Sequence, residues 1–321
     1  MKLSTSILVA LIIFSISGLT IAESYPNKPI RFIVPNAPGG GGDIIIRIVG
    51  QKLFAVWKQQ VIVDNRPGGG SVIGADIVAK AAPDGYTLGL VSISLCINAG
   101  LRKTLPYDPI RDFSPITQIS TQPHLIVIQP GLPVRSVKEL IGFARQKNRS
   151  LNYGTSGTGS GAHLSAELFK KMAGIEMTHI PYKGTAPSMV DLIGGQIDLT
   201  FSTLLGALPH IKAGKVQAIA VTTLQRAPLL ASVPTVSESG LFGFESMSWN
   251  GILAPANTNT SIIDQLNREI IKSLQSPELR EWITNDGAML VVGSLAAFGQ
   301  LIKEEIIKWT TVIKSAGILR E

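Results

Sequence analysis

The sequence predicts an α/β fold made of two domains. Short apolar runs, each the length of a buried strand, alternate with segments of helical periodicity, which is the pattern of a mainly parallel sheet flanked by helices. The chain has 321 residues, and chains of this length usually divide into two domains. Hydrophobic residues make up 45% and charged residues 16%, a balance that supplies a large core and argues against disorder.

Three strands are predicted in the first part of the chain, at residues 30–34, 61–63 and 86–91. Each is followed by a loop and a segment with helical periodicity. The first strand runs into a row of glycines, after which Asp43 is a good cap for the next helix. The sequence Pro83-Asp84-Gly85 is typical of a turn and separates the second helix from the third strand.

The second part of the chain repeats this arrangement without repeating the sequence. Ser136 and Glu139 have the spacing of a helix capping box, and helices dominate from residue 261, with Ser294 as the expected cap of the last long one. We expect the first domain to end at residue 123 and the second to span residues 124–246. The predicted strands of the second part are residues 125–128, 151–153, 177–180, 197–201 and 216–221.

The first 22 residues have the three parts of a signal peptide. Lys2 precedes an apolar run at residues 7–14, and the small-residue pattern Thr20-Ile21-Ala22 follows as a cleavage site. The alternative is a membrane anchor, but this run is shorter than the ~18 residues that cross a bilayer. We therefore expect an exported, periplasmic protein whose mature chain begins at Glu23.

Charge and cysteine content narrow the class of protein further. Cys96 is the single cysteine, which rules out an intramolecular disulfide and suits a bacterial periplasmic protein with a large core. Removal of Lys2 with the signal peptide leaves +6 of the formal charge of +7, an excess that could favour either anionic ligands or an anionic membrane surface. Because lysine and arginine are spread along the chain, the sequence does not indicate nucleic-acid binding.

Two glycine-rich loops at strand–helix junctions are the candidate ligand-binding segments. They span residues 38–43 and 154–161, and the second adds four hydroxyl groups. Glycines let a ligand approach the backbone, and the N–H groups at a helix start attract anions. Either loop alone could be a tight turn with a helix cap. Together, in an exported protein, they favour a cleft lined with neutral donors at the carboxyl ends of the strands.

Motifs for nucleotide binding and hydrolysis are weak or absent. The segment from Gly157 to Ala162 matches a dinucleotide fingerprint, but the strand after it runs into Pro181 and supplies no acidic residue. The sequence has neither a phosphate-binding P-loop nor a G-x-S-x-G nucleophile elbow.

The histidines and the cysteine also give no catalytic or metal-binding set. His163 and Glu167 share a helix face, but two ligands do not make a metal site, so we expect no metal and no other cofactor. Cys96 lies in an apolar segment and is expected to be buried rather than nucleophilic.

Short motifs run in a fixed order along nearly the whole chain after the signal peptide. With them the chain resembles the solute-binding subunits of tripartite tricarboxylate transporters, the Bug family. Each motif is weak alone, but their order and spacing are specific. The motifs are YPNKPI at residues 25–30, PGGGGD at 38–43, DNRPG at 64–68, PDGYTL at 83–88, LPYDP at 105–109, PYKGT at 181–185, GGQID at 194–198, VPTV at 233–236 and WNG at 249–251.

The resemblance implies a two-domain periplasmic binding protein fold of the Venus-flytrap, type II-like kind, which closes over its ligand. Residues 23–123 and 247–321 would form the first domain and residues 124–246 the second. The implied ligand is a small carboxylate held by backbone amides, hydroxyls and water. The implied partners are the large and small membrane subunits of a transporter. The implied protein is a monomer and not an enzyme.

The resemblance also implies which residues bind the ligand. They are Gly39, Gly40, Gly41 and Asp43 in the first loop, Ser92 and Ser94 after the third strand, Thr155, Ser156, Gly157, Ser160 and His163 in and beside the second loop, and Thr185, Asp198 and Ser202. Two positions depart from the family pattern. Asn36 replaces a residue that is mostly aromatic in the family, and Ser202 replaces an aspartate found in many members, so the identity of the carboxylate stays open.

Two other functions stay open from the sequence alone. An exported α/β enzyme, either a hydrolase or a transferase, would need a nucleophile, a base and an orienting group in one pocket, and no such set stands out. A sensor protein that presents its ligand to a receptor would share the same cleft. Arg66 and Lys183 could each contact an anion or brace their own turns.

Overall fold

The computed structural model describes residues 25–35, 38, 41–146, 150–182, 184–285, 287–315 and 317–318. The predicted signal peptide and its cleavage site lie outside these residues. So do four of the positions discussed above: Asn36, Gly39, Gly40 and Lys183.

Three parallel strands begin the fold, as the sequence predicts. They are β1 (Ile30–Val34), β2 (Val61–Asn65) and β3 (Thr87–Ser92), and β1 lies between the other two. The helices that follow them are α2 (Gly41–Trp57), α3 (Val72–Ala79), which comes after the short 3-10 turn η1 (Gly69–Ser71), and α4 (Ser94–Leu101). The apolar side chains of β1 are fully buried, which explains why the hydropathy pattern identifies this strand.

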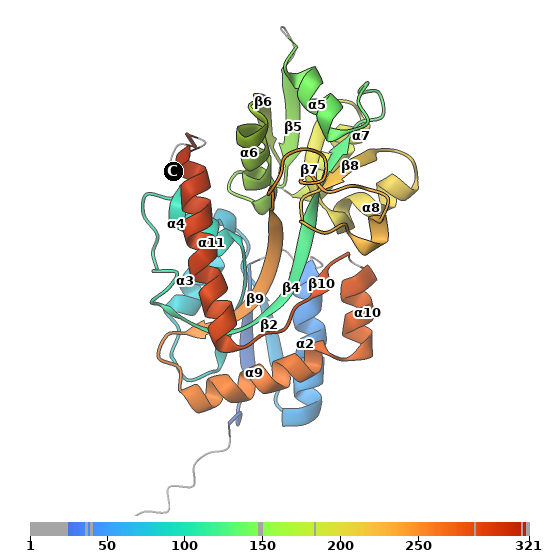
Figure 1. Ribbon diagram of the computed structural model, residues 1–321. Helices are drawn as coiled ribbons and strands as arrows, with labels where there is room; N and C mark the ends of the chain where they lie inside the picture. Colours follow the sequence, from blue (N-terminus) through green and yellow to red (C-terminus); the bar gives the residue numbers. More distant parts are fainter. Residues whose placement is uncertain are drawn as a thin grey trace, which may run out of the picture.

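Two long antiparallel strands join the two parts of the sheet. Figure 1 shows β4 (Phe113–Ile128) and β9 (Met247–Pro255) running side by side through the middle of the molecule. Residues 113–123 of β4 pair with β9, and residues 124–128 pair with β7 (Leu199–Thr203) and β8 (Gln217–Val221). The sequence predicts only the last four residues of β4. Its earlier part contains the buried polar residues Thr117, Ser120 and Thr121, whose burial hydropathy does not reveal.

A second group of parallel strands forms the other end of the sheet. The strands β5 (Leu151–Thr155), β6 (Met177–Pro181) and β7 are parallel, with β5 in the centre. The full strand order is β2-β1-β3-β9-β4-β7-β5-β6, and β8 and β10 (Met289–Leu290) pair with β4 beside this path. The predicted α/β class, with mainly parallel sheets flanked by helices, is confirmed.

The remaining helices cover the two groups of strands. The helices of the second group are α5 (Val137–Ala144), α6 (Gly161–Ala173), α7 (Thr185–Ile193) and α8 (Leu204–Lys212), and the 3-10 turn η2 (Pro228–Leu230) follows. The chain ends with α9 (Thr260–Leu274), α10 (Pro277–Asn285) and α11 (Leu295–Ser315). None of the helices in the described part of the chain combines the length and the apolar character needed to cross a lipid bilayer.

Helix caps follow two of the three predictions. The Ser136 side chain accepts a hydrogen bond from the Glu139 N–H at 3.2 Å, and that of Ser294 accepts one from the Ala297 N–H at 3.2 Å. The prediction for Asp43 is wrong, because α2 begins at Gly41 and Asp43 lies in its first turn. There its negative charge still stabilises the helix dipole.

The two strand groups share a packed junction. Leu164 of α6 is fully buried in one hydrophobic cluster with Trp249 of β9 and Trp309 of α11, so a helix of the second group packs on elements of the first. The predicted boundaries at residues 123 and 247 fall where β4 and β9 pass between the groups. That the groups act as two domains stays a prediction.

Candidate functional site

The loop after β5 lies directly against the segment after β3. A β-carbon built on Gly161 would lie 3.2 Å from Cγ2 of Ile93, and one built on Gly159 would lie 2.6 Å from Cδ2 of Leu101. Since Ile93 stands between Ser92 and Ser94, the structure brings these two predicted serines next to the predicted second loop. The junction therefore places the carboxyl ends of parallel strands from both groups side by side.

The loop from Thr155 to Ser160 is shaped by its own hydrogen bonds. The Thr155 hydroxyl accepts a bond from the Gly157 N–H at 3.2 Å, and Ser160 caps α6 by accepting one from the His163 N–H at 3.2 Å. Gly157 and Gly159 have φ of 134° and 73°, values that favour glycine. This loop has the shape predicted for a ligand-binding segment.

The same loop holds backbone donors that no described residue accepts a hydrogen bond from. The N–H groups of Ser156, Thr158, Gly161 and Ala162 have no hydrogen-bond partner among the described residues. Gly161 and Ala162 begin α6, whose first turn contains no acidic residue. Unpaired N–H groups at a helix start attract anions. The loop can therefore bind a carboxylate with neutral donors.

Three aromatic rings are stacked beside this loop. The centroid of the His163 ring lies 4.1 Å from that of His179, with the planes at 14°, and the centroid of the Tyr153 ring lies 5.0 Å from that of His179, with the planes at 21°. The Gly159 N–H donates to Nδ1 of His163 at 3.2 Å, and Nε2 of His179 lies 2.7 Å from the Thr155 hydroxyl. Both histidines therefore contact the loop itself, one at each end.

An acidic and a basic side chain complete this cluster. Glu167 accepts hydrogen bonds from the Tyr153 hydroxyl and from Lys170, whose Nζ lies 3.0 Å from each carboxylate oxygen. Nε2 of His163 is 4.0 Å from the nearer of these oxygens. Burial lowers the pKa of both histidines to about 4, with Lys170 adding to the effect on His163 and the neighbouring His163 to that on His179. Both rings are therefore neutral at neutral pH.

The first predicted loop is described only in part. Gly41 begins α2, and the Asp43 carboxylate is 1% exposed and accepts hydrogen bonds from Nε of Arg47 and Nδ2 of Asn65, both at 2.9 Å. These bonds tie the end of β2 to the start of α2. They give Asp43 a structural role at the edge of the sheet where the first loop lies.

Three other predicted residues have contacts of their own within the second strand group. Asp198 precedes β7 and accepts a hydrogen bond from the Asn152 N–H at 2.8 Å, at the strand end opposite to Thr155. Ser202 is buried and donates to the Thr203 carbonyl at 3.1 Å. Thr185 begins α7 and packs against Gly206 of α8. Asp198 therefore lies at the far edge of the sheet, whereas Thr185 and Ser202 lie near the carboxyl ends of β6 and β7, at the same edge as the second loop.

Arg66 has a partner of its own. Its Nε lies 2.8 Å from Oδ1 of Asp64, and Nε of Arg31 lies 2.9 Å from the other oxygen of the same carboxylate. The bonds from Arg31, and then those from Arg66, hold the pKa of Asp64 below its usual value. The Arg66 side chain is 50% exposed, so bracing its own turn accounts for its contacts.

Two histidines of this region are missed by reasoning from the sequence. His179 becomes a neighbour of His163 only because β6 pairs with β5, where His179 lies opposite Tyr153. His124 is buried on β4, its Nδ1 has no hydrogen-bond partner, and its ring lies beside Gly161. Neither residue belongs to a motif, so tertiary structure alone identifies them.

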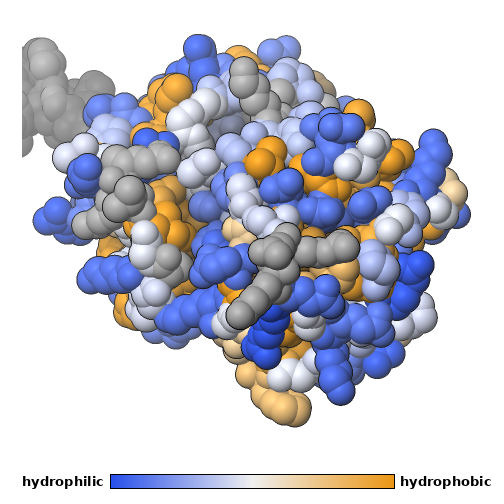
Figure 2. All heavy atoms as spheres, turned by 90° about the horizontal axis from the view of Figure 1, so that it is seen from above, coloured by the Kyte–Doolittle hydropathy of each residue, from blue (hydrophilic) through white to orange (hydrophobic). Residues whose placement is uncertain are grey.

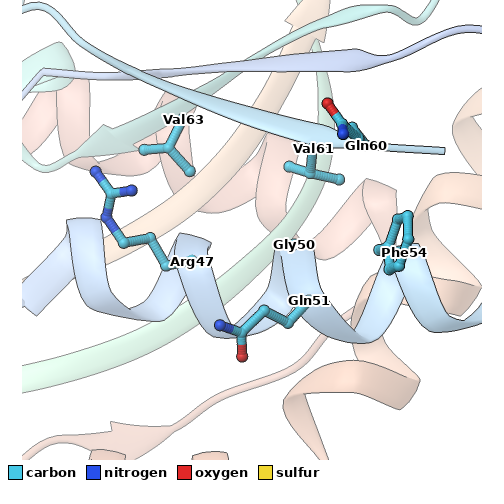
Figure 3. A pocket seen from close by; sticks show the side chains of 7 residues that line it. All are labelled: Arg47, Gly50, Gln51, Phe54, Gln60, Val61 and Val63. Carbon is cyan, nitrogen blue, oxygen red and sulfur yellow. The ribbon is translucent and has the colours of Figure 1, made fainter.

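An open pocket of about 450 Å³ lies elsewhere, between α2 and the edge strand β2. Figure 3 shows Arg47 at one end of it and Phe54 at the other, with Val61 and Val63 directed toward the helix. None of the predicted ligand residues lines this pocket. Among the residues that the structure describes, no group of three or more histidine, cysteine, aspartate or glutamate side chains could hold a metal ion.

The outer surface has a mixed character. Seen from above, hydrophilic side chains cover most of the molecule, and hydrophobic ones are exposed in patches between them (Figure 2). Such a surface is ordinary for a folded protein and does not by itself mark a site.

Comparison with known proteins gives a consistent result. A sequence model described as "Tripartite tricarboxylate transporter family receptor" matches residues 45–318. The protein BugT of Bordetella pertussis is 35% identical over 298 residues, which cover 92% of this chain and 91% of BugT.

Two solved structures are similar over their whole length. A protein of R. palustris solved with adipate has a TM-score of 0.84 and 38% identity, covering 92% of this chain and 99% of that one. MatC of Rhodopseudomonas palustris, solved with bound malate, has a TM-score of 0.81 and 29% identity, covering 90% and 100%.

Proposed function

Because the chain belongs to the tripartite tricarboxylate transporter receptor family, we propose that it captures a small carboxylate outside the cytoplasm and delivers it to a membrane transporter. The predicted resemblance to the Bug family is thereby confirmed. We propose three things beyond family membership: that the ligand is a carboxylate, that the protein is periplasmic, and that its partners are membrane subunits of a transporter.

The observation that carries this proposal is the set of N–H donors at the start of α6 that have no partner among the described residues. They lie in a neutral loop beside Ser92 and Ser94, so a carboxylate bound there would meet hydrogen-bond donors from both strand groups. A buried ionic partner would have to be desolvated at high cost, whereas oriented amides are neutral before the ligand arrives. Relatives with bound adipate and malate support a dicarboxylate as the ligand class.

The proposed receptor role also assigns tasks to the predicted residues. Ser92, Ser94, Thr155, Ser156, Gly157 and Ser160 would contact the ligand from the two strand groups, and Gly39, Gly40 and Gly41 would contribute the first loop. We propose that the groups close over the ligand as two domains, and that a large and a small membrane subunit receive it. A protein of this family acts as a receptor, so no chemical conversion of the ligand is proposed.

A thermal-shift screen tests the proposal. A ligand that binds only the folded protein raises its melting temperature by mass action. We expect at least one C4–C6 dicarboxylate, such as malate or adipate, to raise the melting temperature of the mature chain, and the corresponding diamides to leave it unchanged. A shift with diamides and none with dicarboxylates would contradict carboxylate recognition.

A further inference from the structure

We propose that His163 and His179 are positioning residues that hold the loop after β5 in its ligand-binding shape, and that His163 does so only while its ring is uncharged. The inference rests on the proposed function, in which this loop receives the carboxylate of the ligand. It assigns the stacked pair a role in binding without contact to the ligand, and it couples ligand release to acid.

His163 fixes the far end of the loop through a bond that requires an unprotonated nitrogen. The Gly159 N–H donates to Nδ1 of His163 at 3.2 Å, so Nδ1 must offer its lone pair and the ring proton must sit on Nε2. Gly159 is buried and has φ of 73°. A proton on Nδ1 would set two donors against each other, and the loop would have to leave this position.

His179 fixes the start of the loop through Thr155. Its Nε2 lies 2.7 Å from the Thr155 hydroxyl, which also accepts a bond from the Gly157 N–H and can itself donate to the Gly157 carbonyl at 3.3 Å, so His179 can hold this hydroxyl as a donor or as an acceptor. Thr155 is fully buried, so water cannot replace the histidine there without a rearrangement. The two histidines thus hold the loop at Gly159 and at Thr155, on either side of the free Ser156 and Thr158 N–H groups.

The stacking makes the two rings sensitive to each other's charge. Their centroids are 4.1 Å apart and nearly parallel, so two imidazolium ions would repel strongly at this distance in a buried site. A first proton on one ring therefore opposes a second on the other. A single proton on Nδ1 of His163 is enough to break the bond from the Gly159 N–H and release that end of the loop.

The charged groups around the pair compensate only in part for an added proton, because Glu167 raises the pKa of His179 whereas His163 and Lys170 lower it. On α6, Glu167 faces His163, but Lys170 neutralises it at 3.0 Å. On β5, the Tyr153 hydroxyl donates to Glu167, and Glu176 before β6 is exposed, with its carboxylate 3.7 Å from Lys170. Burial is the largest influence and lowers the pKa of both rings to about 4. Acidification toward this value would charge them.

Calorimetric titration tests whether the histidine pair supports ligand binding. One dicarboxylate that the wild type binds is titrated at neutral pH and at about pH 5 and below. The variant H163L removes the acceptor for Gly159. H163N places an amide oxygen at the same number of bonds from the backbone as Nδ1, and it does not titrate. H210N, in α8 and outside the pair, is the matched control. Protonation of the ligand itself is common to all four proteins and cancels in the comparison.

We expect H163L to bind the dicarboxylate about tenfold more weakly at neutral pH, because it lacks the hydrogen bond that orders the loop at Gly159. H163N should restore most of this loss and should weaken less than the wild type as the pH falls, while H210N should follow the wild type. Circular dichroism checks that each variant is folded, and if H163L is not, the comparison of H163N with the wild type decides.

Wild-type affinity in H163L, or the same pH dependence in H163N as in the wild type, would overturn the inference while leaving the proposed function intact. If the wild type binds no carboxylate at any pH, the proposed function fails and the inference fails with it.

Discussion

Gly159 of the second loop and Leu101 at the end of α4 are packed so closely that a β-carbon on the glycine would lie 2.6 Å from Cδ2 of the leucine. The two residues belong to different strand groups, and their contact sets how near the second loop lies to the segment after β3. The absence of a side chain at Gly159 is therefore part of the geometry of the candidate site.

Gly159→Ala should weaken both the fold and ligand binding. The new methyl group overlaps Leu101, and φ of 73° strains any residue with a β-carbon, so we expect a loss of about 1–3 kcal/mol in the free energy of unfolding. Gly142→Ala in α5, where no atom lies within 4 Å, is the control and should gain about 0.5–1 kcal/mol. Urea denaturation and calorimetry measure both effects. Unchanged stability and affinity in Gly159→Ala would show that the junction is not packed in this way.

Arg66→Ala should leave ligand binding nearly intact. The guanidinium is half-exposed and bonded to Asp64, which keeps Arg31 as a partner in the variant. An exposed ion pair contributes about 1 kcal/mol or less to stability. Calorimetric titration of the variant should give an affinity close to that of the wild type. Abolished binding would mean that the ligand is held by a charged side chain and not by neutral donors.

Acid should destabilise the protein through His124. Burial lowers the pKa of this histidine to about 4, while an unfolded histidine titrates near ~6.5. Between these values the unfolded chain binds more protons, so the free energy of unfolding falls as the pH drops from about 6.5 to about 4, by up to about 3 kcal/mol for this one group.

The variant His124→Leu isolates this contribution. Its free energy of unfolding, measured by urea denaturation across the same pH range, should fall less steeply than that of the wild type. His163 and His179 contribute equally in both proteins, so the difference between the two slopes belongs to His124. Parallel slopes would contradict a buried, neutral His124.

Cys96 should be inert in the folded protein. Its side chain is fully buried, as the sequence predicts, and burial, assisted by Glu305, raises the pKa of the thiol well above its usual range. Only the thiolate reacts with disulfide reagents. A chromogenic disulfide should label one thiol in denaturant and none under native conditions. Rapid labelling of the native protein would refute the packing around α4.

Much of the fold could be predicted because its strands are apolar and its loops are rich in glycine. The early part of β4 could not, since Thr117, Ser120 and Thr121 are buried polar residues whose partners lie far along the chain. The second loop follows from local sequence. The pairing of His163 with His179 does not, because it depends on the register between β5 and β6.

Two serine caps allow the most direct test of where the ligand binds. Ser160 caps α6 at the proposed site and Ser136 caps α5 away from it, each accepting a backbone N–H at 3.2 Å. Replacing either by alanine should cost about 1 kcal/mol of stability. Titration calorimetry of Ser160→Ala and Ser136→Ala with the same dicarboxylate should show a loss of about tenfold in affinity for the first, about 1.4 kcal/mol, and none for the second. Equal affinities in the two variants would contradict carboxylate binding at the start of α6.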